Sequence, residues 1–157
     1  MAHRKEQYQN TTKLLGTILK RVRQYRHMTE TDLAKAMNIA LSTYSGWETG
    51  RSRPAFEHVM QFAIETRTDG VAIMCALLMQ DTDFALRCAD NMFASTILKG
   101  LDGINDRLGD GISLMESSAI MESVEAICNS IVKFKKQREN TAEHWLDKNG
   151  FGLRAKL

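Results

Sequence analysis

Apolar side chains near the start of the chain recur at the spacing of an α-helix. Between Thr11 and Arg26 the spacing is 3-4-3, which places all of these side chains on one helical face. The pattern therefore predicts a first helix whose inner face carries Leu15, Ile18, Val22 and Tyr25.

Two short helices are predicted next. The second follows Thr29, because a threonine hydroxyl caps a helix well and Asp32 stands three residues later. Asn38 suits the left-handed turn that would end it. The third runs from Leu41 to Glu48, with Tyr44 and Trp47 facing inward, and its outer face carries Leu41, Ser42, Ser45 and Gly46.

Two further helices complete a predicted five-helix unit. Pro54 is expected to open the fourth, with Phe56, Val59, Met60 and Ala63 facing inward. Residues 71–79 are all apolar, too few to cross a membrane, and predict a fully buried fifth helix. It would lie between the first unit and the following chain, or between two protomers.

The rest of the chain is predicted to form a helical hairpin. One helix is expected from Thr82 to Leu108 and another from Ile112 to Arg138, with the break at residues 109–111. Each carries a narrow apolar seam, which favours self-association, although folding onto the fifth helix within a monomer is the alternative. The seam residues expected to mediate dimerisation are Ile97, Leu101, Ile104, Leu108, Ile120, Val124, Ile127 and Ile131.

Composition agrees with a helical protein. The chain has 157 residues, 43% hydrophobic and 25% charged, which suits one domain with an extension. Pro54 is its one proline, so an all-α fold is expected. No run of about 18 apolar residues occurs, so no membrane-spanning segment is expected. We therefore expect the protein to be cytoplasmic.

Charge divides the chain into unlike parts. Residues 1–67 carry a net +5, residues 68–132 a net −7, and residues 133–157 a net +4, which together give the total of +2. A polyanion such as double-stranded DNA is therefore expected to contact the first part.

No pattern of catalytic or metal-binding residues is present in the sequence. The four histidines are scattered, and Cys75, Cys88 and Cys128 form no CxxC pair. We expect buried thiols, no metal, no cofactor and no enzymatic activity.

Two segments resemble the phage-repressor-like (XRE) helix-turn-helix regulators. Met28 to Ala34 is similar to that family's turn and second helix, and Ser42 to Pro54 to its recognition helix and exit loop. The resemblance as a whole spans residues 14–79. Its most specific part is the run through Trp47, Glu48, Gly50 and Pro54.

The resemblance implies how DNA would be bound. The third helix would lie in the major groove, while the start of the second helix and the basic loop would contact phosphates. Arg23 and Glu48 would form an ion pair between the first and third helices. The residues expected to contact DNA are Thr29, Glu30, Leu41, Ser42, Thr43, Ser45, Gly46, Thr49, Arg51 and Arg53.

Four positions depart from the family pattern, namely Glu30, Ala40, Leu41 and Gly46. Glu30 puts a carboxylate near an expected phosphate, and Gly46 stands where a long polar side chain often reaches a base. Direct readout of base edges is therefore expected to be modest, with DNA shape or dimer spacing adding specificity. The Arg4-Lys5 arm would either enter a minor groove or remain a solvated terminus.

The expected function is that of a DNA-binding transcriptional regulator from a bacterium or phage, a repressor acting as a homodimer on a palindromic operator. The alternative is an antitoxin or inhibitor that binds a protein partner, with a secondary or autoregulatory helix-turn-helix. The expected organisation is a basic flexible arm at 1–10, the helix-turn-helix domain at 11–80, a helical dimerisation region at 81–140, and a terminal helix and tail at 141–157.

Overall fold

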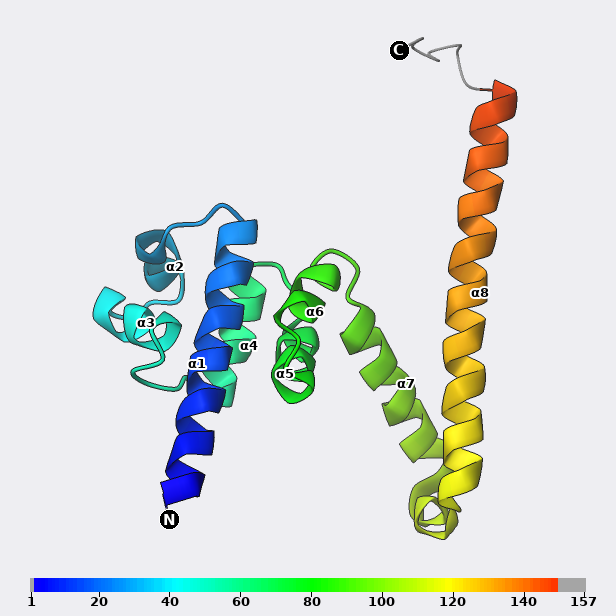
Figure 1. The fold of residues 1–157 in the computed structure, drawn as a ribbon, viewed down its shortest axis with the longest axis horizontal. Helices are drawn as coiled ribbons and strands as arrows, with labels where there is room; N and C mark the ends of the chain where they lie inside the picture. The colour runs from blue at the N-terminus through cyan, green and yellow to red at the C-terminus, as the bar shows by residue number, and fades with distance from the viewer. Residues whose placement is uncertain (1, 150–157) are drawn as a thin grey trace. The chain divides into compact units, whose positions relative to one another are not determined.

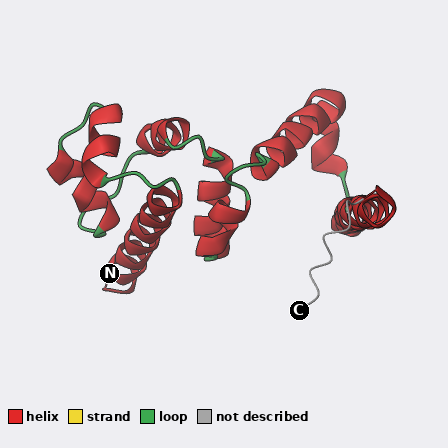
Figure 2. Cartoon of the chain, turned by 90° about the horizontal axis from the view of Figure 1, so that it is seen from above, coloured by secondary structure: helices red, strands yellow, loops and turns green. Residues whose placement is uncertain are grey.

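The computed structural model describes residues 2–149, and within that range the regular structure is entirely helical (Figures 1 and 2). The all-α prediction is therefore confirmed. The chain divides into two compact units, Met1–Arg107 and Leu108–Leu157. The helices are α1 (Ala2–Tyr25), α2 (Glu30–Ala36), α3 (Leu41–Glu48), α4 (Phe56–Glu65), α5 (Gly70–Met79), α6 (Thr82–Arg87), α7 (Phe93–Leu108), the 3-10 helix η1 (Gly109–Leu114) and α8 (Ser117–Asn149).

Helix α1 is the central element of the first unit and contacts α3, α5 and α6 (Figure 1). Its inner face carries the predicted Leu15, Ile18 and Val22, all buried, whereas Tyr25 is 44% exposed. The helix begins at Ala2, so the expected arm at residues 1–10 is helical from Ala2 onward. Nothing in the sequence interrupts it, because residues 2–15 include neither glycine nor proline.

The turn between α2 and α3 follows the predicted chemistry. The Thr29 side chain caps α2 by accepting a hydrogen bond from the Asp32 amide at 3.1 Å. Asn38 adopts a left-handed φ of 54°, and the Ile39 amide then donates to the Ala34 carbonyl at 3.0 Å. These two features set the ends of α2 and direct the chain into α3.

Two predictions for α4 and α5 are wrong. Phe56 does not face inward but is 59% exposed, because the helix starts at Phe56 itself after the Ala55 cap, while Val59 and Ala63 face the core. Helix α5 is not fully buried, since Leu78 is 80% exposed. Its neighbours α1, α4 and α6 cover the other side of the helix, where Ala72, Ile73, Ala76 and Leu77 are buried.

The helix predicted from Thr82 to Leu108 is in fact two helices. The chain turns through residues 88–92, where Met92 has a left-handed φ of 52°, and α7 starts at Phe93. The turn allows Cys88 and Ala94 to pack together against Ala72 of α5. Tertiary packing therefore overrides a local sequence that suits a continuous helix.

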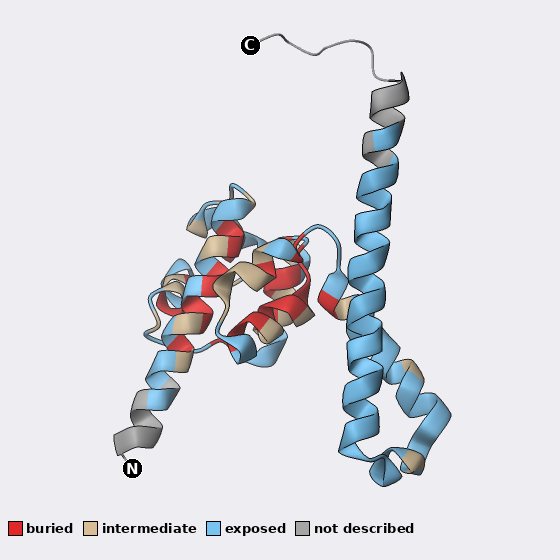
Figure 3. Ribbon diagram, turned by 45° about the vertical axis from the view of Figure 1, so that its right-hand side comes forward, coloured by how far each residue is buried: buried red, intermediate tan, exposed pale blue. Residues whose placement is uncertain are grey.

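The second unit consists mainly of α8. This helix starts at Ser117 and continues to Asn149, so residues 141–149 belong to it and residues 150–157 of the expected tail lie outside the described residues. Each side chain of α8 whose burial is described is exposed (Figure 3). The pairing of the two predicted hairpin arms stays a prediction.

Candidate DNA interface

Helix α3 presents one face to solvent and the other to the core. Tyr44 and Trp47 are 0% and 4% exposed and pack edge to face with their ring centroids 6.0 Å apart. On the opposite side Leu41 is 46% exposed, Ser42 and Thr43 are exposed, and Ser45 is half-buried. The first turn of α3 therefore offers one apolar and two hydroxyl side chains to a ligand.

A buried ion pair fixes α3 against α1. Arg23 donates from Nε and Nη2 to the two carboxylate oxygens of Glu48, at 2.6 and 2.8 Å, and from Nη1 to the Met28 carbonyl at 2.9 Å. The Tyr44 hydroxyl donates to Glu48 Oε1 at 2.6 Å. These contacts join the end of α1, the turn before α2 and the C-terminal half of α3.

The electrostatics of this cluster follow from its burial. The hydrogen bond to Glu48 raises the pKa of Arg23 above its usual range, against the opposing effect of burial. Burial, followed by the hydrogen bond to Glu48, raises the pKa of the Tyr44 hydroxyl far above its usual value. Arg23 therefore stays charged and Tyr44 stays a neutral donor at every pH at which the domain would bind DNA.

Gly46 differs from the expectation, because it is buried and does not face outward. Its carbonyl accepts hydrogen bonds from the Arg51 and Ser52 amides at 2.9 and 3.1 Å, and a Cβ at this position would stand 2.9 Å from Ser52 Oγ. Gly46 thus permits the close approach of the exit loop and offers no atom to a base.

The exit loop carries two exposed arginines. Gly50 has a φ of +70°, which turns the chain out of α3 into residues 51–53. Arg51 Nε donates to the Thr49 hydroxyl at 3.1 Å, and that hydroxyl donates to the Ser45 carbonyl at 2.8 Å. Arg51 and Arg53 are both exposed beside the C-terminal end of α3.

The start of α2 is exposed, and the structure shows where the unusual Glu30 carboxylate lies. Glu30 Oε1 is 3.8 Å from Arg23 Nη2, so part of its charge is offset by the cation beneath it. The Thr29 hydroxyl donates to Asp32 Oδ2 at 2.6 Å, which closes the cap. The expected DNA-contacting residues of α2, α3 and the exit loop all belong to the same domain, and every one except Gly46 is at least partly exposed.

Sequence reasoning missed a second polar cluster, which joins α7 to the domain. Asp69 is fully buried and caps α5 by accepting from the Val71 and Ala72 amides, and it also accepts from the Ser95 amide at 3.0 Å and the Ser95 hydroxyl at 2.6 Å. Burial would raise the pKa of Asp69, but the hydrogen bonds, those from Ser95 above all, lower it below its usual value. Only the N-cap part of this arrangement has a local sequence signal.

Further missed contacts join α1 to α6 and the turn after it. Arg26 donates to Asp90 Oδ1 at 2.7 Å and to the Arg67 and Ala89 carbonyls, while the Tyr25 hydroxyl donates to Asp90 Oδ2 at 2.6 Å. Arg21 pairs with Asp83. Arg21 and Arg26 are therefore engaged in contacts within the domain and are not available to a phosphate backbone.

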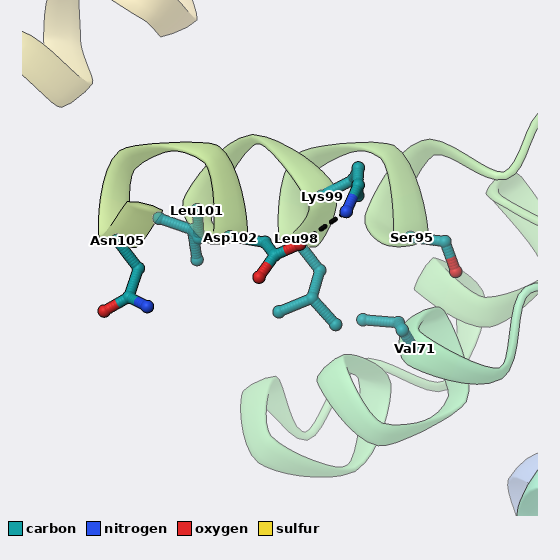
Figure 4. A pocket seen from close by; sticks show the side chains of 7 residues that line it. All are labelled: Val71, Ser95, Leu98, Lys99, Leu101, Asp102 and Asn105. Carbon is teal, nitrogen blue, oxygen red and sulfur yellow. Dashed lines mark hydrogen bonds and ion pairs between the residues drawn. The ribbon is translucent and has the colours of Figure 1, made fainter. Parts of the chain in front are cut away.

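An open groove of about 600 Å³ lies between α5 and α7 (Figure 4). Val71 of α5 faces Leu98 of α7 across it, and the remaining lining comes from α7 (Figure 4). Among the polar side chains there, Ser95 is half-buried and donates to Asp69, and the exposed Lys99 is paired with Asp102, so the groove shows no preference for a particular small ligand.

The other predicted site residues lie on exposed surfaces. The expected dimerisation residues of α7 and α8 are between 38% and 56% exposed. Of the cysteines, Cys88 is buried, Cys75 is half-buried and Cys128 is exposed, so the expectation of buried thiols is wrong for Cys128. Among the described residues, no cluster of three or more His, Cys, Asp or Glu side chains could hold a metal ion, and no helix could span a membrane.

Comparison with known proteins agrees with the geometry of the first four helices. Residues 19–69 match the family model described as Helix-turn-helix, and this segment contains α2, α3, α4 and the C-terminal end of α1. No curated protein and no solved structure matched the chain. The matched family is a DNA-binding regulatory domain and not an enzyme family. Residues 19–69 of this chain are therefore a helix-turn-helix domain of the XRE type.

Proposed function

We propose that the protein is a transcriptional regulator, a repressor that binds a palindromic operator as a homodimer in the cytoplasm of a bacterium. The observation that carries this proposal is the exposed outer face of α3 in a helix-turn-helix domain. A dimer of such domains binds two half-sites about one helical turn, roughly 34–36 Å, apart. Occupying both half-sites would block a promoter that overlaps them.

Different residues would serve affinity and specificity. Arg51, Arg53 and the start of α2 at Thr29 would contact phosphates, which position the domain without reading the sequence. Leu41 would contact a thymine methyl group, and the hydroxyls of Ser42, Thr43 and Ser45 would make single hydrogen bonds to base edges. Arg23, which lies beneath Glu30, would offset part of the repulsion between the Glu30 carboxylate and a phosphate.

The outer face of α3 has no side chain for a bidentate contact with guanine or adenine. Each bidentate pair contributes about 1–3 kcal/mol of discrimination between bases, so its absence limits direct readout. Specificity would then depend on the sequence-dependent shape of the DNA and on the fixed spacing of two half-sites. The second half of the molecule is consequently as important to the proposed function as α3.

The proposal is tested by selecting bound fragments from random DNA and footprinting the full-length protein on the selected site. A protected palindrome supports it, and uniform binding to all fragments contradicts it. The logarithm of the affinity should fall linearly with the logarithm of salt concentration, with a slope of about −0.9 per phosphate contact. Arg51→Ala and Arg53→Ala should each reduce that slope by about 0.9, whereas Lys99→Ala on α7 removes an equal charge and should not.

A protein-binding role is the second candidate, and the exposed apolar side chains of α7 and α8 favour it. An antitoxin or inhibitor would hold another protein there and use its helix-turn-helix for autoregulation. Co-purification of the chain with a stable stoichiometric partner would support this role. An operator protected by the pure protein alone, with full affinity, would contradict it.

A further inference from the structure

Helix α8 carries a continuous apolar stripe that this chain leaves exposed. Its apolar residues repeat at 4-3-4-3 spacing, the seam of a coiled coil, and are between 38% and 61% exposed (Figure 3). With 33 residues the helix is about 50 Å long. The stripe, which we call the α8 seam, consists of Ile120, Val124, Ile127, Ile131 and Phe134.

The α8 seam is complementary to itself when two copies run in opposite directions. In an antiparallel pair, each a position of one helix packs against a d position of the other. Val124 and Ile131 occupy a positions, and Ile127 and Phe134 occupy d positions. Val124 then lies opposite Phe134 of the second copy and Ile127 opposite Ile131, so four successive layers are apolar and a two-fold axis passes near Asn129.

The charge distribution along α8 favours the same direction. The part before the axis carries Glu122 and Glu125, and residues 133–139 after it carry four cations and the carboxylate of Glu139, which pairs with Lys135, all exposed. An antiparallel pair sets the acidic half of each helix beside the basic half of the other. A parallel pair would set the four cations of one helix beside the same four of its partner, which is unfavourable.

We propose that α8 pairs with α8 of a second copy of this chain as an antiparallel coiled coil centred near Asn129. This inference rests on the proposed homodimeric function and adds the surface, the register and the direction of pairing. On either side of the axis the register brings Cys128 beside Cys128 of the second copy and Ser130 beside its equivalent. Asn129 points away from the seam.

The register fixes how far apart the two helices begin. The Ser117 ends of the two helices are 24 residues apart along the axis, about 36 Å at a rise of 1.5 Å per residue. Residues near the axis, such as Cys128, lie close to their equivalents in the second copy.

Spin labels on the full-length protein test the direction of pairing. One sample is labelled at the natural Cys128, and a Cys128→Ser, Ser117→Cys variant is labelled near the start of α8, with Cys128→Ser alone giving the background from Cys75 and Cys88. Pulsed electron resonance should give a short distance at residue 128 and one larger by about 30 Å at residue 117. Equal distances at both sites would mean a parallel pair and would overturn the proposal.

Charge reversal provides an independent test. Glu125→Lys replaces the acidic side chain next to the seam residue Val124 with a basic one and should weaken self-association roughly threefold, measured by sedimentation. In a parallel pair the same change exchanges one like-charge repulsion for another and leaves the association constant unchanged, which would contradict the proposal. Glu57→Lys in α4 is the matched control for a change in net charge.

The oligomeric state separates this inference from the proposed function. A mass of 17.8 kDa at micromolar concentration, or labels that report no second copy, would overturn the α8 pairing and leave α7 or another protein as the occupant of the seam. Binding of the same sample to a selected operator would then still support regulation by DNA binding. A dimer with equal label distances would leave the regulatory function intact and overturn only the antiparallel pairing.

Discussion

Glu48 is the residue at which α1, α3 and the core converge. Its carboxylate is 3% exposed and accepts hydrogen bonds from Arg23 and Tyr44. Removing one member of a buried pair leaves the other charge without compensation, which typically costs about 3–5 kcal/mol. We therefore expect Glu48→Ala to lower the free energy of unfolding, measured in urea, by that amount and to abolish DNA binding through loss of the fold.

Tyr44→Phe provides the matched control for that prediction. It removes one donor to Glu48 but keeps the ring, which packs against Trp47 and Phe62. A hydrogen bond to a charged group contributes about 1.5–3 kcal/mol, so this variant should be destabilised less than Glu48→Ala. If Glu48→Ala unfolds at the wild-type urea concentration, the pair makes no net contribution and the prediction is wrong.

Asp69 gives the domain a defined response to acid. Its pKa is lower in the folded protein than the value of about 3.9 in an unfolded chain, so the ionised carboxylate stabilises the fold above pH 4. That contribution is lost as the pH falls through the folded pKa. Equilibrium unfolding at pH 7 and pH 3 should therefore show lower stability at pH 3.

Asp69→Asn isolates this effect, because an amide is uncharged over the same range. The variant should be less stable than wild type at pH 7, since one of its two terminal atoms can no longer accept from Ser95 or the α5 amides. Its stability should also change less between pH 7 and pH 3. An unaltered pH dependence in Asp69→Asn would show that other carboxylates cause the acid response.

At the scale of the helices, Gly16 sets how closely α1 and α3 approach. A Cβ at this position would stand 2.2 Å from the Trp47 carbonyl oxygen and 2.9 Å from that of Glu48, so Gly16→Ala must push the helices apart. Overpacking of this kind typically costs about 1–3 kcal/mol or more, well above the helix propensity that alanine gains. We expect a lower melting temperature by circular dichroism.

Gly100→Ala is the control with the same chemical change. Gly100 lies in α7, and a Cβ there would meet nothing within 4 Å. Only the helix propensity of alanine then acts, and it favours the helix by up to about 1 kcal/mol. Opposite shifts in the two variants are expected, and a destabilised Gly100→Ala would indicate a neighbour for α7 outside the single chain.

The helices that the sequence predicted best are those with local signals at both ends. The Thr29 cap, the left-handed Asn38 and the Tyr44-Trp47 pair define α2 and α3 within a few residues of the chain. The break between α6 and α7 has a weaker local signal, the Asn91 side chain that accepts from the Phe93 amide, and it depends mainly on the packing of Cys88 and Ala94 against α5. The same holds for the burial of Gly46, which is determined by a loop that folds back over it.

At the scale of the whole molecule, the residues of the candidate site were predictable from the sequence, but the contacts that hold the surrounding helices together were not. The exposed face of α3 follows from helical periodicity, as the sequence indicated. Arg26, Asp90 and Asp69 hold α6 and α7 to the domain through contacts between residues more than 25 positions apart. Contacts between residues so far apart in the sequence produce no local pattern, so they could not be predicted from the spacing of residue types.

The α8 seam links dimerisation to DNA binding in the proposed function. A second half-site increases the affinity for the operator only when two helix-turn-helix domains are joined in one dimer. Linking two binding modules typically increases affinity by 10² to 10⁴. Ile127→Asp with Ile131→Asp places four carboxylates in the centre of an antiparallel pair, which should give a monomer by light scattering. The substitutions lie outside the helix-turn-helix domain, so affinity for a single half-site should stay at the wild-type value, while affinity for the full operator should fall at least about a hundredfold. Asn129→Asp adds a carboxylate to the same helix away from the seam and should change neither quantity. A double variant that remains dimeric, or that loses single-site binding as well, would contradict the assignment of dimerisation to α8.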